Sequence, residues 1–147
     1  MPDDIQNALD RIGRDCFCLH SRMTARAVTR QYNAVLAPLG LEVTEFSLLA
    51  EIKKGHHESI AELADNLAFE RTTLVRNLQR MAEHGLIENA NDRGRAIKYV
   101  LTSKGTRLLS KALPLWVKAQ ASVNKQLAPN APSCVLKALR DLRKATR

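Results

Sequence analysis

Residues 59–105 constrain the fold of this chain more than any other stretch. Ser59 and Glu62 have the S-x-x-E spacing of a capping box, which predicts a helix that begins at Ile60. Apolar residues then recur at the i, i+3, i+4, i+7 spacing of a buried helix face, namely Ile60, Leu63, Ala64 and Leu67. The apolar phase is then interrupted, and a second helix is predicted to begin near Arg71.

The second helix has one apolar face and one face rich in hydrogen-bond donors. At about 100° per residue, Leu74, Leu78 and Met81 share the inner side. The outer face and its flanks carry hydroxyl, amide and guanidinium groups: Arg71, Thr72, Thr73, Arg76, Asn77 and Arg80. Phosphates and base edges are recognised by donors of this kind, so the face is a candidate DNA contact, although any exposed helix face is polar.

Two short β-prone runs follow this helix and predict a hairpin. Gly85 is placed to end the helix, and the runs lie on either side of a turn-rich tip at residues 91–95. The tip carries Arg93 and Arg95, and Lys98 follows it as a further candidate contact. A hairpin after a helix-turn-helix is a wing, and its arginines suit the negative potential of an AT-rich minor groove.

In this order the motifs resemble the MarR family of bacterial transcription regulators. The motifs that carry the resemblance are S-I-A-E-L-A, R-T-T-L-V-R-N-L-Q-R-M-A-E-H-G-L-I and L-T-S-K-G, with Y-N-A-V-L-A-P-L-G-L-E-V-T-E-F-S-L-L-A before them. The resemblance covers nearly the whole chain. It implies a homodimer that binds a pseudo-palindromic double-stranded DNA operator, with recognition helices in major grooves and wings in flanking minor grooves. It also implies release from DNA on a small ligand or on thiol oxidation.

The wing departs from the family pattern at one place. The family's wing usually reads D-x-R at a fixed distance before the L-T pair. Counted back from that pair, Arg95 falls at the arginine position. Arg93 stands where the acid is expected, and Asp92 is one place early. The resemblance therefore assigns the minor-groove arginine to Arg95.

Composition narrows the class of protein. The chain has 147 residues, 45% of them hydrophobic, which suits one folded domain. Its formal net charge of +8 favours a polyanionic partner, although a merely basic protein shares this feature. No apolar run is long enough to span a membrane, the N-terminus does not resemble a signal peptide, and three cysteines are an odd number. We therefore expect a cytoplasmic protein without membrane contact.

Apolar stripes flank the core on both sides. The N-terminal stripe has the spacing 4-3-4-3-4 of one long amphipathic helix: Ile5, Leu9, Ile12, Cys16, Leu19 and Met23. Such a stripe needs a partner, which is either a second subunit, as the resemblance implies, or the core of the same chain. We expect a mainly α fold with a small β-hairpin wing. A winged helix-turn-helix core (44–105) would be flanked by N-terminal (1–37) and C-terminal (106–147) dimerisation helices within a single domain, 1–147.

Candidate N-cap residues, together with glycine and proline, predict where the remaining helices begin, bend and end. Thr44 is the expected N-cap of the helix that precedes the core and ends near Gly55. Thr102 or Ser103 should cap the helix after the wing, which Pro114 should kink. Asn130 is a plausible N-cap of the last helix, whose apolar residues are Val135, Leu136, Leu139 and Leu142.

The segment Cys16-Phe17-Cys18-Leu19-His20 resembles the reactive-cysteine region of the organic-peroxide-sensing branch of the family. By this match Cys16 is the sensing thiol, and Cys134 is a candidate resolving cysteine of the partner subunit. The branch's two supporting tyrosines are missing, since His20 and Val43 stand at those places. The alternative is that Cys16 lies on the apolar stripe and only packs. Cys18 would point away from Cys16 on a helix, so we do not expect these two to bridge.

The family's other trigger is a small aromatic anion bound between the flanking helices and the core. His20, Arg26 and Trp116 are candidate lining residues, together with Arg22 and Tyr32. None stands at a spacing that identifies a ligand.

Three other classes of protein are alternatives for this sequence: a non-specific DNA-binding protein, a thiol-dependent redox protein and an enzyme. A non-specific nucleoid-type DNA-binding protein shares the charge and the wing, and a thiol-dependent redox protein would use Cys16. We do not expect an enzyme, because the chain lacks a Gly-rich phosphate loop, H-E-x-x-H, C-x-x-C and a base–nucleophile pair. We expect no cofactor and no metal, and His56-His57 is typical of a solvated loop without further ligands.

Overall fold

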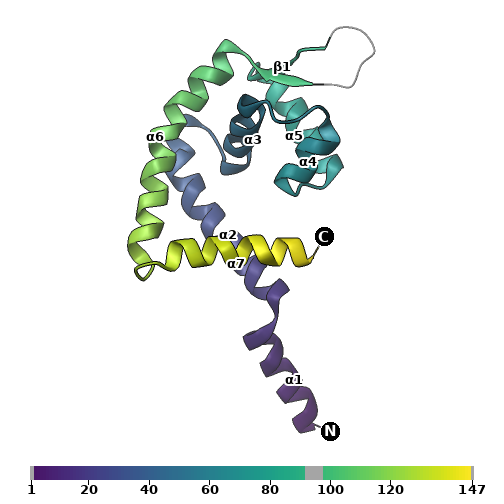
Figure 1. Ribbon diagram of the computed structural model, residues 1–147, viewed down its shortest axis with the longest axis vertical. Helices are drawn as coiled ribbons and strands as arrows, with labels where there is room; N and C mark the ends of the chain where they lie inside the picture. Colours follow the sequence, from purple (N-terminus) through teal and green to yellow (C-terminus); the bar gives the residue numbers. More distant parts are fainter. Residues whose placement is uncertain (1, 92–97, 147) are drawn as a thin grey trace.

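The structure, a computed structural model, describes residues 2–91 and 98–146. The elements in chain order are α1 (Pro2–Asp15), α2 (Phe17–Leu36), the 3-10 helix η1 (Ala37–Leu39), α3 (Val43–Lys54), α4 (Ile60–Leu67), α5 (Arg71–Glu83), β1 (Ile87–Asn89), β2 (Tyr99–Leu101), α6 (Ser103–Gln126) and α7 (Ala131–Ala145). The mainly α architecture with a small β-hairpin is confirmed (Figure 1).

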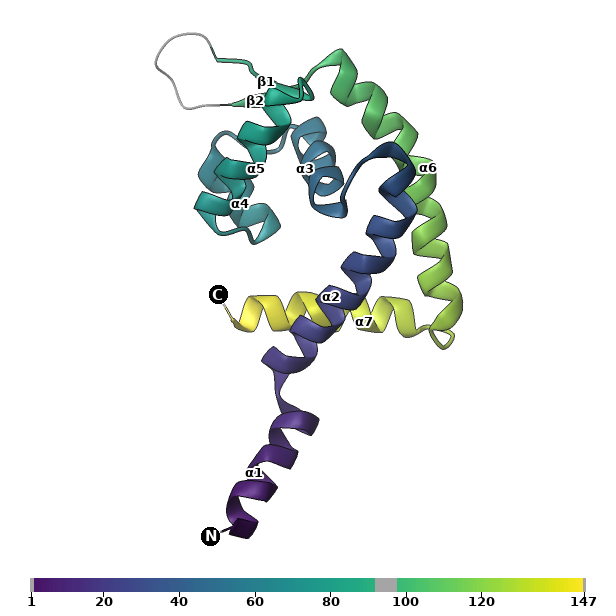
Figure 2. The same ribbon diagram turned by 180° about the vertical axis from the view of Figure 1, so that it is seen from behind.

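Helices α3, α4 and α5 and the hairpin form one lobe, from which α2 and α6 run together (Figures 1 and 2). Helix α7 turns back from the end of α6 and lies against α2, since the two helices line common pockets. Helix α1 extends away from the rest of the molecule in both views.

The core of the lobe contains the residues that the helical periodicity places inside. Leu74, Leu78 and Met81 of α5 are completely or almost completely buried, as are Leu63 of α4 and Leu48 of α3. Full burial of such a side chain contributes about 1.5–3 kcal/mol, so these contacts hold the two helices of the predicted helix-turn-helix together.

The hairpin has the position that the sequence predicts. β1 and β2 are antiparallel, with Ile87 opposite Leu101 and Asn89 opposite Tyr99. The expected tip arginines, Arg93 and Arg95, lie outside the described residues.

One threonine joins the hairpin to α6. Thr102 is the N-cap, and its Oγ1 accepts a hydrogen bond from the Gly105 amide at 3.0 Å. The same hydroxyl lies 2.7 Å from the Gly85 carbonyl oxygen, to which it donates. The cap predicted at this position is confirmed, and α6 continues through Pro114.

The prediction of one long N-terminal helix is wrong. Cys16 has an extended backbone (φ −75°, ψ 107°) and separates α1 from α2. Its Sγ accepts a hydrogen bond from the Leu19 amide at 3.4 Å, so the cysteine caps α2. Gly13 and Asp15, just before the break, are weak helix formers. The spacing of apolar residues carries no information about helix propensity, so it does not predict the break.

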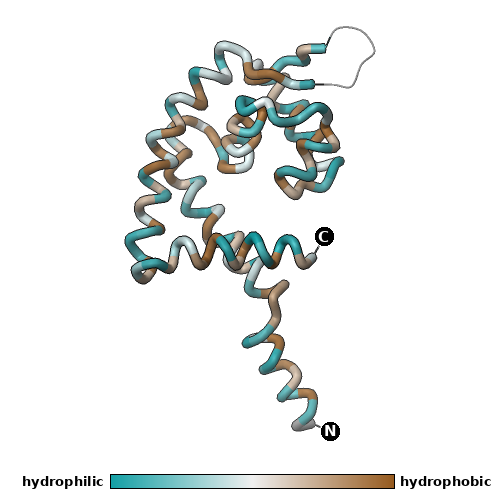
Figure 3. Tube along the Cα trace, viewed as in Figure 1, coloured by the Kyte–Doolittle hydropathy of each residue, from teal (hydrophilic) through white to brown (hydrophobic). Residues whose placement is uncertain are grey.

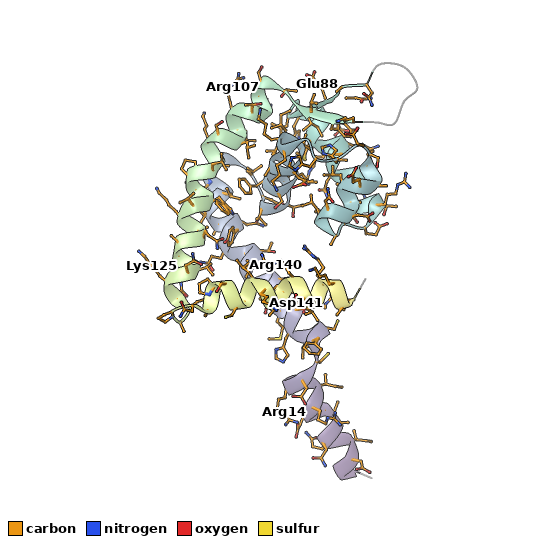
Figure 4. All side chains as sticks on the ribbon, viewed as in Figure 1. Arg14, Glu88, Arg107, Lys125, Arg140 and Asp141 are labelled. Carbon is orange, nitrogen blue, oxygen red and sulfur yellow. The ribbon has the colours of Figure 1, made fainter. Side chains whose placement is uncertain are left out.

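The alternative in which the N-terminal stripe packs within the same chain is also wrong. Ile5, Leu9 and Ile12 are 66%, 55% and 52% exposed. Figure 3 shows apolar positions along α1, which has no other element of the described chain beside it, and Figure 4 shows the side chains around this helix, with Arg14 labelled.

Three local predictions near the core need correction. The N-cap of α3 is Glu42 instead of Thr44, and Glu45 Oε2 accepts from the Glu42 amide at 3.2 Å. In the capping box before α4, the Ser59 hydroxyl accepts from the Glu62 amide as expected, whereas the Glu62 carboxylate accepts from the Glu58 amide instead of that of Ser59. Asn130 does stand at the N-cap of α7 as predicted, but it has a left-handed conformation and its side chain makes no capping hydrogen bond.

The prediction of a solvated His56-His57 loop is half wrong. His56 is exposed, but His57 is only 2% exposed, and neither of its ring nitrogens has a hydrogen-bond partner in the part of the chain that the structure describes. Among the described residues no three His, Cys, Asp or Glu side chains gather as metal ligands. No helix in that part of the chain is long and apolar enough to cross a membrane.

Candidate nucleic-acid interface

The turn between α4 and α5 sets the direction of the candidate recognition helix. Ala68 ends α4 in the left-handed region (φ 54°), and the Phe69 amide donates to the Ala64 carbonyl at 2.9 Å. Phe69 packs partly buried against the core, and Glu70 then begins α5 as its N-cap. Because Leu74 and Leu78 are anchored inside, the opposite face of α5 is turned outward.

Glu70 holds the first turn of α5 through four hydrogen bonds. Its carboxylate accepts from the Thr72 amide at 3.1 Å and from the Thr73 amide at 2.9 Å. It also accepts from the hydroxyls of Thr72 and, at 3.2 Å, of Thr73. The hydroxyl and amide of Thr72 are the main causes that lower the pKa of Glu70 to about 2, so this exposed carboxylate is ionised at neutral pH.

Arg71 and Arg76 are the two guanidinium groups of the predicted face that remain available to a ligand. Both side chains are exposed, and neither has a hydrogen-bond or ion-pair partner among the described residues. A guanidinium carries five N–H donors and binds phosphate or the guanine edge bidentately. These two residues have the exposure and the chemistry that the sequence-based assignment requires.

Arg80 and Asn77 are already engaged within the protein. Arg80 Nη2 lies 3.2 Å from Glu45 Oε1, and the Glu45 side chain is largely buried, with 10% exposed. The Asn77 amide donates to the Thr73 carbonyl at 3.0 Å. Arg80 therefore connects α5 to α3, and a contact of either side chain with DNA stays a prediction.

The base of the wing carries an ion pair. Lys98 Nζ lies 3.3 Å from Glu58 Oε1. This ion pair connects the residue directly before β2 to the segment before α4. The Glu58 side chain is largely exposed, so the pair contributes little to stability. Lys98 thus pairs with a residue just before the helix-turn-helix, and its role on DNA stays a prediction.

The three cysteines are free, and they lie at different places. Cys16 is half-buried at the junction of α1 and α2, whereas Cys18 and Cys134 are exposed. The premise that Cys16 and Cys18 share one helix is wrong, because Cys16 precedes α2. His20 Nε2 lies 3.2 Å from the Arg14 carbonyl oxygen, and among the described residues no hydrogen bond joins its ring to the Cys16 thiol.

The predicted pocket residues are not brought together. Trp116 stacks on Phe46, with 6.4 Å between ring centroids, at a pocket of about 400 Å³ between α3 and α6. His20 lines a separate pocket of about 350 Å³ between α2 and α7. Arg26 lies at neither of these two pockets and is exposed.

Sequence reasoning did not identify Glu70 and Glu45 as parts of the site. Glu70 stands directly before R-T-T, which is the N-cap position, but glutamate is not among the preferred capping residues. Glu45 lies 35 residues before its partner Arg80, and no local pattern connects the two.

The lobe, with its outward-facing α5 and paired strands, defines a winged helix-turn-helix DNA-binding protein. Residues 41–105 match a family described as "Winged helix DNA-binding domain". None of the curated proteins matches the chain significantly. Among solved structures, the chain is similar to the Mycobacterium tuberculosis transcriptional regulator MosR, with 35% identity, a TM-score of 0.78 and coverage of 90% of this chain and 96% of that one.

MosR has also been solved in complex with DNA (35% identity, TM-score 0.79, the same coverage). A cysteine-to-serine mutant of Escherichia coli MarR, solved with operator DNA, shares the fold at 21% identity and a TM-score of 0.76, over 92% of this chain and 96% of that one. The chain belongs to the MarR family of winged-helix regulators. It is a DNA-binding transcription regulator of the MarR type.

Proposed function

We propose that this regulator is a cytoplasmic homodimeric repressor that binds a pseudo-palindromic operator through α5 and the wing. The observation that carries the proposal is the outward face of α5, on which Arg71 and Arg76 are exposed and without partners in the described chain. Its relative MosR, of 35% identity, has been solved with DNA. The assignment of Thr72, Thr73, Asn77, Arg80, Arg93, Arg95 and Lys98 to the same interface is part of this proposal.

The homodimer is proposed from apolar surface that a single chain leaves uncovered. On α1 this surface consists of Ile5, Leu9 and Ile12, and on α7 of Val135, Leu136 and Leu139. The six side chains are between 41% and 66% exposed, and large exposed apolar surfaces mark interaction sites. We therefore assign residues 1–37 and 106–147 to dimerisation, and residues 44–105 to DNA binding.

The proposal is tested by binding to DNA from upstream of the protein's own gene. The reduced protein should bind a labelled duplex from this region ~10³–10⁷-fold more tightly than a random duplex of equal length. Equal affinity for both duplexes would contradict the repressor proposal and favour a non-specific DNA-binding protein.

Arg76→Ala is expected to weaken operator binding by ~1–3 kcal/mol, because one bidentate base contact is lost. The affinity for random duplex should fall much less. The preference for one base should therefore relax at the position in each half-site that Arg76 contacts. A competition assay with single-base operator variants measures both effects. Lys53→Ala is a matched control, since it removes an exposed cation from α3 instead of α5. Equal losses on operator and random duplex would make Arg76 a phosphate contact.

We propose that release follows either oxidation of Cys16 or binding of a small aromatic anion. Cys16 is half-buried at the α1–α2 junction, and its Sγ caps α2, so oxidation of the sulfur would disturb the start of that helix. For the aromatic anion, the Trp116–Phe46 pocket offers a stacking surface beside Lys54.

The first alternative predicts that an organic hydroperoxide abolishes operator binding and that a thiol reductant restores it. The Cys16→Ser variant should bind the operator and resist the oxidant, whereas Cys134→Ser tests the proposed resolving cysteine. If oxidised wild-type protein binds as tightly as the reduced protein, oxidation is not the trigger, and a titration with small aromatic acids addresses the second alternative.

A further inference from the structure

The carboxylate of Glu70 determines how two hydroxyls on the candidate DNA-binding face are oriented. Oε2 accepts from the Thr73 amide at 2.9 Å and from the Thr73 hydroxyl at 3.2 Å. Oε2 also accepts from the Thr72 hydroxyl, and Oε1 from the Thr72 amide at 3.1 Å. All three side chains are exposed at the start of α5.

The direction of the two hydroxyl bonds follows from the charge of Glu70. Its pKa is lowered to about 2, mainly by its hydrogen bonds with Thr72, so the group is a carboxylate at neutral pH. An ionised carboxylate only accepts hydrogen bonds, and a hydroxyl has one proton and two lone pairs. Thr72 and Thr73 must therefore each direct their single hydroxyl proton at Glu70.

The hydroxyls then present only acceptor lone pairs to an incoming duplex. Phosphate oxygens, guanine N7 and O6, and thymine O4 are acceptors and cannot bond to such a group. In the major groove the donors are the exocyclic amino groups, N6 of adenine and N4 of cytosine. An oriented threonine hydroxyl on a recognition helix is thus matched to amino-bearing bases.

We propose that Glu70 is a specificity-determining positioning residue, which makes Thr72 and Thr73 acceptors that read an adenine or cytosine amino group in the major groove. This inference rests on the proposed function, in which α5 enters the major groove of an operator. Glu70 itself touches no base, and it acts through the two threonines.

The negative charge of Glu70 has a second consequence, which is to weaken non-specific binding to DNA. The N-terminus of a helix attracts phosphate, because its free amides and dipole favour an anion. Here the Thr72 and Thr73 amides are already occupied by Glu70, whose negative charge repels the DNA backbone. Glu70 therefore lowers affinity for every duplex while it favours the correct bases.

The test compares the wild-type protein with Glu70→Gln on one duplex, selected by the wild-type protein from a randomised library. In single-position derivatives of this duplex, adenine is replaced by purine, which lacks the N6 amino group, or cytosine by 2-pyrimidinone, which lacks the N4 amino group. For wild type, at least one replacement per half-site should weaken binding ~5- to 150-fold, the effect of losing one good base contact. Thr72→Val or Thr73→Val should remove this sensitivity at the position that the residue reads.

Glu70→Gln should bind random duplex more tightly than wild type and lose most of the sensitivity to the missing amino group. A glutamine side chain has one oxygen, which can still accept from one of the two helix amides, and an NH2 group, which can donate to the threonine hydroxyls and reverse them. Glu42→Gln is the matched control, because it makes the same change at the N-cap of α3, and both properties should stay at the wild-type level.

Three outcomes would overturn the inference. Wild type could be indifferent to every amino-group deletion, Glu70→Gln could retain full sensitivity, or Glu70→Gln could bind operator and random duplex equally more weakly. The last result is expected if Glu70 only stabilises the helix. Failure of the proposed function is distinguishable, because then no duplex is enriched in the selection at all.

Discussion

Replacement of Gly105 by alanine is expected to destabilise the protein by about 3 kcal/mol or more, one of the largest effects open to a single methyl group. A Cβ atom at Gly105 would lie 2.0 Å from the Leu86 carbonyl oxygen and 3.0 Å from its carbon. Both are backbone atoms, so no side-chain rotation relieves the overlap. The same carbonyl accepts a hydrogen bond from the Thr102 amide at 3.1 Å, which holds it in place.

The change should also weaken DNA binding, because the affected contact joins the hairpin to α6. Thr102 contacts Gly85, Leu86 and Gly105 at once, so a displaced Gly105 would shift the wing relative to α5. Thermal unfolding should show a fall of about 6–12 °C for ~3 kcal/mol in a domain of this size.

Gly13→Ala is the matched control. Gly13 lies within α1, and apart from its chain neighbours and the backbone of its own helix, no heavy atom of the described residues lies within 4 Å of a Cβ built there. Alanine is a better helix former by about 0.5–1 kcal/mol, so this variant should be as stable as wild type or slightly more stable. If Gly105→Ala unfolds at the same temperature as Gly13→Ala, the close packing of α6 on the Leu86 carbonyl is wrong.

The parts of the fold that local rules control could be predicted from the sequence. The 3.6-residue period placed Leu74, Leu78 and Met81 inside, and all three are buried. Gly55 and Gly85 follow helix ends with φ of 70° and 67°, a conformation that glycine adopts without a Cβ penalty. A short polar cap such as Thr102 also acts within one turn of its own position.

Contacts between distant segments could not be predicted in this way. The Arg80–Glu45 pair depends on how α5 crosses α3, which no single-helix pattern contains. The burial of His57 arises likewise from packing, since the isolated H-H dipeptide is typical of a solvent-exposed loop. The break at Cys16 overrides an apolar spacing that continues across it, so periodicity predicted one helix where the structure has two.

In the candidate site, too, some features follow from the local sequence and others depend on the three-dimensional structure. The exposure of Arg71 and Arg76 follows from the helix period. The hydrogen bonds from the Thr72 and Thr73 hydroxyls to the Glu70 carboxylate depend instead on side-chain geometry at the N-cap. The sequence therefore predicted which groups face outward, but not which of them have a free proton to donate. That distinction decides what each group can bind on DNA: a group with a free proton can bind phosphate oxygens and base acceptors, whereas a hydroxyl whose proton is directed at Glu70 can bind only amino groups.

Ile12→Asp is expected to convert the proposed dimer into a monomer. The side chain of Ile12 is 52% exposed in the single chain and lies on the same α1 stripe as Ile5 and Leu9. If a partner subunit covers the stripe, aspartate would place an unpaired charge in an apolar interface, at a cost of several kcal/mol. Sedimentation equilibrium of the variant and of wild type at equal concentration measures the change in mass.

The DNA-binding consequence is larger than the loss of any single contact. A dimer binds its second half-site intramolecularly, and linking two sites in this way raises overall affinity ~10²–10⁴-fold. Monomeric Ile12→Asp should lose that factor on a two-half-site operator and keep wild-type affinity for an isolated half-site. Asn7→Asp adds the same charge on the opposite side of α1 and should remain dimeric. A dimeric Ile12→Asp protein would exclude α1 from the interface and leave α7 as the apolar surface that a partner must cover.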